Sequence, residues 1–92
     1  MESIPNQPEN QQSQLDRAYD QQWQHHLAYE ARARLTLQEK QKEEELQAYL
    51  YEINLADRQL LVSQQQQERQ ALLQQHRAMR IALRKGHHQA GL

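Results

Sequence analysis

The chain has 92 residues, of which 37% are hydrophobic, with no Phe and a mean hydropathy of −1.16. So few large apolar side chains in so short a chain exclude a packed globular interior. The formal net charge of −1 gives nucleic acid no electrostatic advantage as a partner, and the absence of Cys excludes disulfides and thiolate metal sites. No apolar run approaches the length of a signal sequence or a membrane span, so we expect a soluble intracellular protein.

The first twelve residues contain both prolines of the chain, Pro5 and Pro8, among Asn, Gln and Glu. The residue before a proline is disfavoured in helical backbone, and a segment of this composition has little apolar surface to bury. We therefore predict an extended arm over residues 1–12.

Start and stop signals predict one long helix over residues 13–85. Ser13 followed by Asp16 is typical of a helix N-terminus, because a hydroxyl and a carboxylate there bind free backbone amides. No Gly or Pro follows until Gly86, which comes directly after Lys85 and suits the left-handed residue that often ends a helix. An unbroken helix would extend roughly 110 Å, and residues 86–92 would form a short tail. The predicted fold is all-α, a single extended helix without a globular core, with weak points at Thr36, Asn54 and Ser63.

The apolar residues of this helix do not keep the heptad register of a coiled coil. A four-residue step runs from Leu15 to Leu27, whereas a seven-residue step runs from Leu46 to Leu60, and residues 63–70 contain no large apolar side chain. A helix with such an interrupted face cannot draw its stability from one continuous seam. We therefore expect a partner surface to supply the stabilising contacts.

Three separate apolar patches are the expected anchor points on that partner, with Trp and Tyr as the strongest contacts. Two alternatives remain open, a homo-oligomeric bundle and a helical hairpin, although a hairpin would favour Gly or Pro at its turn and the sequence offers neither. The expected partner-binding residues, including three arginines, are Tyr19, Trp23, Leu27, Tyr49, Ile53, Arg58, Leu60, Leu61, Arg69, Leu72, Arg77, Met79 and Leu83.

Charge is segregated along the chain. Residues 39–57 are mainly acidic, whereas only Arg and Lys follow Glu68 as charged residues. A basic amphipathic helix can bind an anionic membrane, but the apolar face here is thin. Docking on an acidic protein surface is therefore favoured over membrane binding, and a basic face that is simply solvated stays open as an alternative to docking.

The sequence offers no recognisable catalytic or cofactor site. His25 and His26 are adjacent, so their side chains point about 100° apart on a helix, which disfavours a shared metal ion. No Gly-rich phosphate loop and no nucleophile with a positioned base are present. We expect a protein that is not an enzyme and that holds neither a metal nor a cofactor.

The segment from Glu52 to Leu83 resembles the small helical microtubule inner proteins of ciliary doublets. In that family a Glu precedes a Leu-Ala, basic-Gln-Leu-Leu core, and a Gln-rich helix with a His and a later Leu follows. The sequence differs from this pattern at Asp57 and Met79. The positions that carry the resemblance are Glu52, Leu55, Ala56, Arg58, Gln59, Leu60, Leu61, His76 and Leu83.

The resemblance implies a structural protein in the lumen of the doublet microtubules of an axoneme, in a cilium or flagellum. It would bind tubulin and neighbouring inner proteins, stabilise the lattice and need no cofactor. We expect one chain per binding site rather than a homo-oligomer. The alternatives are a homo-oligomeric helical rod or adaptor in another large assembly, such as a secretion apparatus or a virion, and a basic membrane-surface helix.

Overall fold

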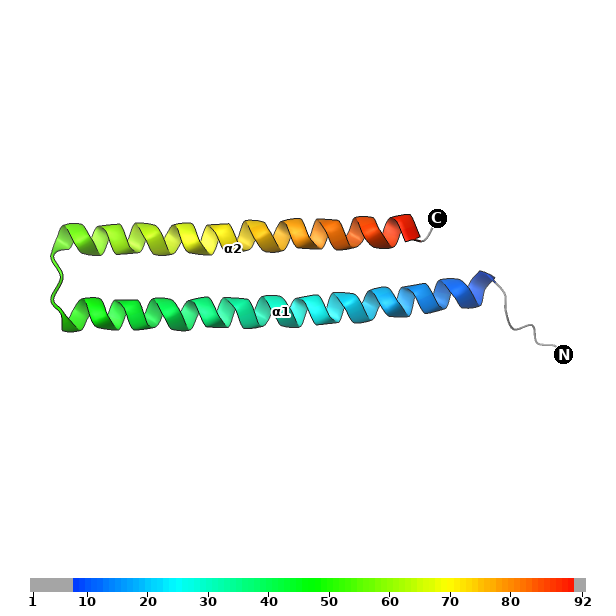
Figure 1. Cartoon of the computed structure of the whole chain (residues 1–92), viewed down its shortest axis with the longest axis horizontal. Coiled ribbons are helices and arrows are strands. Elements are labelled where there is room, and N and C mark those ends of the chain that lie inside the picture. The colour runs from blue at the N-terminus through cyan, green and yellow to red at the C-terminus, as the bar shows by residue number, and fades with distance from the viewer. Residues whose placement is uncertain (1–7, 91–92) are drawn as a thin grey trace.

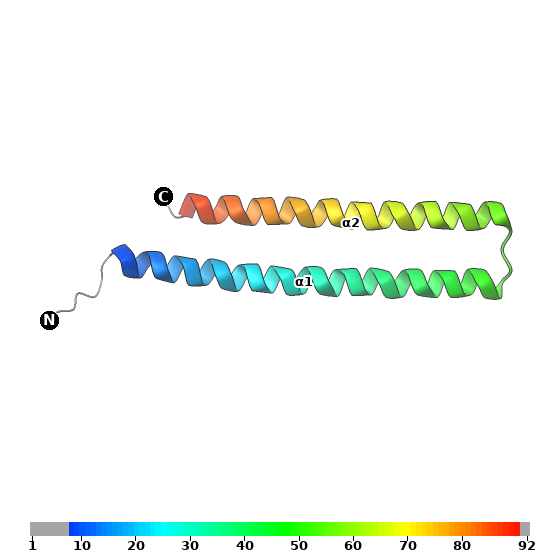
Figure 2. The ribbon, with the colours of Figure 1, turned by 180° about the vertical axis from the view of Figure 1, so that it is seen from behind.

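The computed structural model describes residues 8–90, which form two helices, α1 (Pro8–Leu50) and α2 (Leu55–Ala90). The helices lie antiparallel and side by side, with the start of α1 and the end of α2 at one end of the rod (Figures 1 and 2). The predicted all-α class is confirmed. The prediction of a single long helix is wrong, because the chain turns back on itself and forms a helical hairpin.

The helix α1 begins earlier than predicted. Pro8 occupies its first position, where the missing N–H is not needed and the fixed φ suits a helix. Residues 8–12, which the sequence analysis assigned to an extended arm, are therefore helical, and Ser13 lies inside α1. Residues 1–7 of the predicted arm lie outside the described part of the chain.

The turn between the helices needs no Gly because Glu52 takes the left-handed conformation, with a φ of 51°. The Ile53 N–H donates to the Ala48 carbonyl (3.2 Å) and the Glu52 N–H donates to the Tyr49 carbonyl (3.2 Å). These two bonds form a Schellman motif, which satisfies carbonyls left free at the end of α1. A left-handed residue other than Gly is unfavourable, which is why a hairpin was expected to favour Gly or Pro at its turn. Glu52 takes this conformation nevertheless, so that expectation is not met here.

The helix α2 starts at a cap provided by Asn54. Its Oδ1 accepts a hydrogen bond from the Asp57 N–H (2.8 Å), and its carbonyl accepts one from the Arg58 N–H (3.0 Å). Asn is among the best N-cap residues for this reason. The predicted weak point at Asn54 is thus the place where the helix breaks, whereas Thr36 and Ser63 lie inside helices.

The predicted end of the helix at Lys85 is also wrong. The helix α2 continues through Gly86, which has no positive φ, to Ala90. Residues 86–90 of the predicted tail are therefore helical, and residues 91–92 lie outside the described part of the chain.

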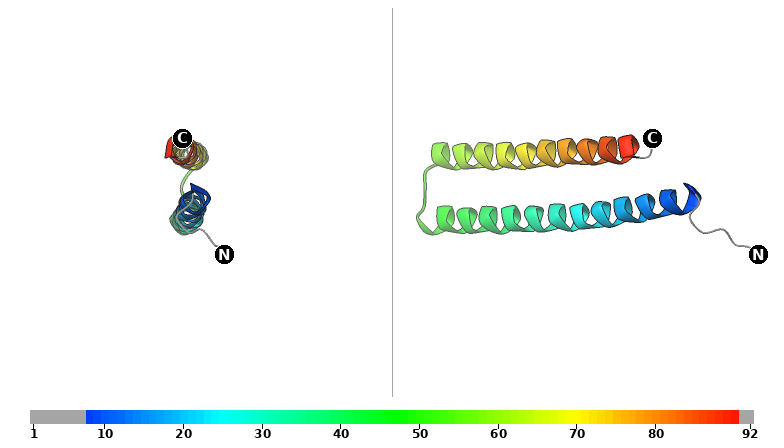
Figure 3. Two further views of the ribbon diagram at one scale, coloured as in Figure 1. Left: turned by 90° about the vertical axis from the view of Figure 1, so that its right-hand side faces the viewer. Right: turned by 45° about the vertical axis from the view of Figure 1, so that its right-hand side comes forward.

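The two helices make one layer, as the view along the rod shows (Figure 3). Contact between them is confined to one seam, and the opposite side of each helix has no covering element within the described residues. Among residues 13–87, for which side-chain burial is described, no hydrophobic side chain is buried. The hairpin therefore has a seam in place of an apolar core.

Candidate functional site

The interior of the seam is polar. Within residues 13–87 the buried side chains are those of Glu30, Gln41, Gln65 and His76, each exposed by 5% or less. Burying a polar group is unfavourable unless it is hydrogen-bonded. The pairing of these side chains across the seam therefore determines how the two helices fit together.

Polar pairs recur along the seam every eleven residues in both helices. Eleven residues complete three turns at about 3.67 residues per turn, which is close to the roughly 3.6 residues per turn of a straight helix. Residues spaced by eleven therefore lie on one face of the helix. In each pair the two residue numbers add up to 106, which means that the register is unbroken along the rod. The pairs, which we call the polar seam, are Tyr19 with His87, Glu30 with His76 and Gln41 with Gln65.

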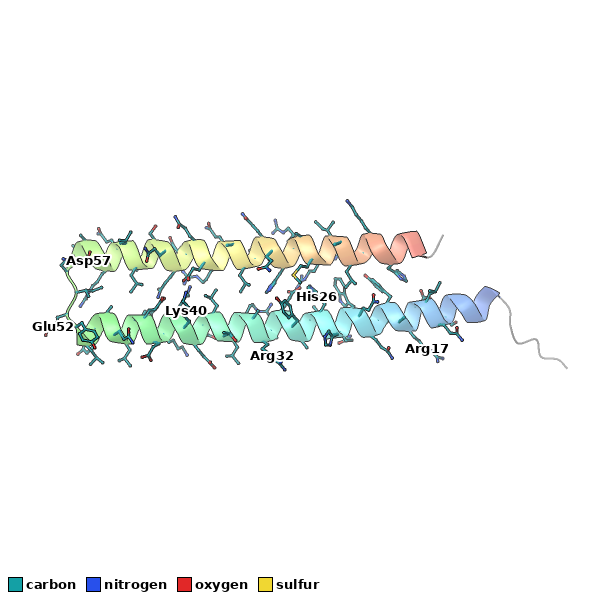
Figure 4. The ribbon with its side chains drawn as sticks, viewed as in Figure 1. Arg17, His26, Arg32, Lys40, Glu52 and Asp57 are labelled. Atoms are coloured by element: carbon teal, nitrogen blue, oxygen red, sulfur yellow. The ribbon has the colours of Figure 1, made fainter. Side chains whose placement is uncertain are left out.

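Glu30 is the centre of the most extensive polar contact. Arg80 donates two hydrogen bonds to its carboxylate, from Nε to Oε2 (2.7 Å) and from Nη2 to Oε1 (2.6 Å). His26 Nε2 lies 2.5 Å from Oε2 and His76 Nδ1 lies 3.8 Å from Oε1, and Figure 4 shows His26 between the helices. Arg34 Nη1 approaches Oε1 at 3.6 Å. A single carboxylate thus joins both helices.

The charge state of Glu30 follows from these contacts. The hydrogen bonds from Arg80 hold the pKa of Glu30 below its ordinary value of 4.5, and the charge of Arg80 acts in the same direction, while burial opposes both. Although His26 Nε2 is close to the carboxylate, neither it nor the buried His76 Nε2 makes a hydrogen bond of acceptable geometry. The carboxylate is therefore ionised at neutral pH, with Arg80 as its main partner.

These groups do not form a metal site in the structure. Within the described residues, no group of three or more His, Cys, Asp or Glu side chains is placed to hold a metal ion. The carboxylate that could serve as a ligand is already occupied by Arg80. The cluster is better explained as a structural joint.

The layer nearer the turn is a reciprocal pair of amides. Gln41 Nε2 donates to the Gln65 carbonyl (3.0 Å), and Gln65 Nε2 donates to the Gln41 carbonyl (3.2 Å). Arg69 Nη1 donates to Gln41 Oε1 (2.8 Å), and Lys40 pairs with Glu68 beside it, where Figure 4 shows Lys40 facing α2. The two amides can form these reciprocal bonds only when Gln41 and Gln65 lie opposite each other. The layer therefore specifies how the two helices align.

Large apolar side chains gather at the turn of the hairpin and are exposed there. Of the twelve large hydrophobic side chains that are exposed within residues 13–87, seven lie between Leu46 and Val62, with exposures from 51% to 79%. Exposed apolar patches are typical of interaction sites on protein surfaces. We call these seven residues the turn end: Leu46, Tyr49, Leu50, Tyr51, Leu55, Leu60 and Val62.

The structure divides the expected partner-binding residues into two groups. Those facing solvent are Tyr49, Arg58, Leu60, Arg69 and Arg77, of which Arg69 also donates a hydrogen bond to Gln41 in the seam. Trp23 illustrates the other group, because it stacks near Tyr19 and lies under the Arg84 guanidinium at 5.6 Å. The half-buried residues, which belong to the seam or the turn, are Tyr19, Trp23, Leu27, Ile53, Leu61, Leu72, Met79 and Leu83.

Several residues of the polar seam received no role in the sequence analysis. His26 and Glu30 are four residues apart and therefore adjacent on one helix face, which was a usable signal. The eleven-residue spacing was a second signal, but a search for heptads does not detect it. The overlooked residues of the polar seam are Glu30, Gln41, Gln65 and His87, and those that contact Glu30 beside it are His26 and Arg80.

Comparison with known proteins adds no assignment. No protein-family model, curated protein or solved structure matches this chain. Neither of the two described helices has a stretch long and apolar enough to cross a membrane. A functional proposal therefore depends on the hairpin itself and on the resemblance noted in its sequence.

Proposed function

We propose that this chain is a non-enzymatic structural protein that docks on a partner through its turn end. One observation carries the proposal: seven large apolar side chains are exposed at the turn, while no hydrophobic side chain within residues 13–87 is buried. Apolar surface removed from water contributes about 25 cal/mol per Å², so covering the turn end supplies stabilisation that the hairpin lacks by itself.

The host that we propose is the lumen of axonemal doublet microtubules, where the protein would bind tubulin and neighbouring inner proteins. The resemblance to the ciliary inner proteins supports this choice, since its core lies at the turn and at the start of α2. Within that core Leu55 and Leu60 belong to the turn end and Arg58 is exposed. His76 is buried in the seam, so its role in such a complex is to hold the hairpin.

Co-polymerisation with tubulin tests this proposal. The protein is added before polymerisation, so that a luminal site is open to it, and the polymer is then pelleted. The wild-type chain should pellet with microtubules, and replacing Tyr49 and Leu60 with Ser should weaken binding roughly tenfold or more, because aromatic and Leu anchors carry much of such energies. A matched control replaces Leu35 and Leu73 with Ser. These two residues lie away from the turn and are 54% and 60% exposed.

The control variant should pellet like the wild type. The proposal is contradicted if the wild-type chain stays in the supernatant. It is equally contradicted if the Tyr49→Ser/Leu60→Ser variant pellets as well as the control does.

A further inference from the structure

Arginines recur along one side of α2. Arg58, Arg69 and Arg80 are eleven residues apart, the same interval as the pairs of the polar seam, so they lie in one row along the helix. Val62 and Leu73 form a second row with the same interval, four residues after the first two arginines, and they are 52% and 60% exposed. Residues four apart are neighbours on the surface of a helix. This side of α2 therefore alternates guanidinium groups with exposed apolar side chains.

A hollow beside the seam extends this basic side onto α1. Leu37 of α1 and Leu72 of α2 both line it, and three of the four charged side chains around it are basic. These charged residues are Arg34, Lys42, Arg69 and Glu45. We call the two rows of α2 together with this hollow the arginine face.

The other side of the seam carries a different charge. Three adjoining hollows lie there, and the charged side chains that line them are three acidic and two basic. These residues are Glu44, Asp57, Glu68, Arg32 and Lys40. The excess of positive charge is thus a property of one face of the hairpin.

The arginines that touch the seam still have donors for a partner. A guanidinium carries five N–H groups. Arg69 donates one hydrogen bond to Gln41, and Arg80 donates two to Glu30 while its side chain stays 41% exposed. Each of the two can therefore hold a carboxylate of another molecule without leaving the seam.

We propose that an acidic helix of a partner protein lies along the arginine face. Its carboxylates would pair with the row of arginines and with Lys42, and its apolar side chains would cover Val62, Leu73 and the hollow. Carboxylates placed every eleven residues on a straight helix are about 16–17 Å apart, which is also the spacing of the arginines. A third helix would also give the hairpin the second packed layer that it lacks.

The apolar row favours a protein helix over a nucleic acid. Contacts with phosphates need only positive charge, whereas Val62 and Leu73 gain from a partner that removes them from water. The formal net charge of −1 gives the chain no long-range attraction for a polyanion. The chemistry of this face therefore selects a helix that carries both carboxylates and apolar side chains.

The arginine face is a second docking surface, beyond the proposed function. Of its apolar residues Val62 also belongs to the turn end, whereas Leu73 and the hollow lie away from the turn. The hairpin would thus bind its host through the turn and an acidic helix along its side. The two kinds of binding can be measured separately.

Fluorescence anisotropy with labelled synthetic peptides at low ionic strength tests the proposal. In each peptide a Glu recurs every eleven residues on a background of Ala and Gln. A Leu follows each Glu by four residues in one peptide and by seven in the other, which fit the two directions in which a helix can lie along α2. One of the two should bind the hairpin at least roughly tenfold more tightly than a scrambled peptide of the same composition.

Charge reversal on the arginine face should weaken this binding. Arg58→Glu and Lys42→Glu should each raise the dissociation constant roughly tenfold, because an attractive contact becomes repulsive. Arg32→Glu makes the matched change on the other side of the seam and should leave the constant unchanged. Circular dichroism verifies that each variant remains helical.

Two apolar variants complete the test. Leu73→Ser should weaken binding of the peptide, which a purely ionic contact would not show. Leu60→Ser changes the turn end and should leave binding of the peptide unchanged, so that failure of this proposal is distinguished from failure of the proposed docking on tubulin.

Equal binding of the patterned and scrambled peptides would overturn the proposal. Equal effects of Arg32→Glu and Lys42→Glu would overturn it as well, because net charge alone would then explain the binding. A double-stranded DNA oligonucleotide that binds more tightly than either peptide, with no effect of Leu73→Ser, would assign the arginine face to nucleic acid instead.

Discussion

Arg80 donates two hydrogen bonds to the carboxylate of Glu30, which lies fifty residues earlier in the chain. Paired hydrogen bonds between a guanidinium and a carboxylate are among the stronger polar contacts in proteins and have a fixed geometry. This contact joins the middle of α1 to the last third of α2. It therefore selects the hairpin over any extended form of the chain.

Breaking this contact should destabilise the hairpin. Arg80→Leu leaves the buried Glu30 carboxylate without its main partner, and we expect a loss of about 1–3 kcal/mol in the free energy of unfolding. Replacing both residues with Leu should cost less than Arg80→Leu alone, because no unpaired charge remains. Urea unfolding followed by circular dichroism at one fixed protein concentration measures both effects.

The matched control for that measurement is Arg77→Leu, which removes an exposed arginine from the same helix. It should change stability by only a few tenths of a kcal/mol, as is usual at the surface. Equal effects of Arg77→Leu and Arg80→Leu would show that the contact with Glu30 does not stabilise the hairpin.

Acid should open the hairpin through the same carboxylate. The hydrogen bonds from Arg80 lower the pKa of Glu30 in the folded state below 4.5, so its contribution to stability is complete above the unfolded pKa and is lost as the pH falls through the folded pKa. Lys40 lowers the pKa of Glu68 in the same way. Helicity measured from neutral to strongly acidic pH should therefore decrease at a midpoint below 4.5.

Glu30→Gln provides the comparison for this titration, because it removes the titrating group while keeping its shape. The variant should be less stable at neutral pH and should lose less helicity on acidification than the wild type does. Identical acid transitions in the two proteins would assign the effect to other carboxylates.

The strained turn residue should be improvable. Glu52 adopts a φ of 51°, which side chains with a Cβ disfavour by roughly 1–2 kcal/mol. Glu52→Gly should therefore raise the free energy of unfolding by about 0.5–1 kcal/mol, after the greater chain entropy of Gly is included. Thermal unfolding compares Glu52→Gly with Glu52→Ala, and the alanine variant should give no such gain. Equal stability of the two variants would mean that residue 52 does not take the left-handed conformation.

The sequence predicted helical structure well because local preference decides it. Gln, Glu, Ala, Leu and Arg favour helix almost everywhere, and Asn54 is a strong cap at the point where the chain breaks. The turn could not be predicted in the same way. The left-handed conformation of Glu52 is imposed by the pairing of the two helices and not by the preference of the residue itself.

The seam escaped prediction for a different physical reason. Hydrophobic periodicity is the usual signal of helix packing, but the buried positions of this seam are Glu30, Gln41, Gln65 and His76. Their eleven-residue spacing appears in the sequence only when polar residues are examined together with apolar ones. Tyr49 and Leu60 were among the residues expected to contact a partner, and both are exposed at the turn end.

The central claim of this account is that α1 and α2 fold back on each other. It is tested most directly by the distance between residues 21 and 85 within one molecule. Gln21→Cys and Lys85→Cys place fluorophores at two exposed positions whose numbers add up to 106, in a chain without other cysteines. Doubly labelled protein is diluted into an excess of unlabelled protein, so that only distances within one chain are observed.

The hairpin predicts near-complete energy transfer, because paired helices lie about 8–10 Å apart between their axes. A single continuous helix would separate the two sites by roughly 96 Å at 1.5 Å per residue. Energy transfer close to zero would therefore contradict the hairpin.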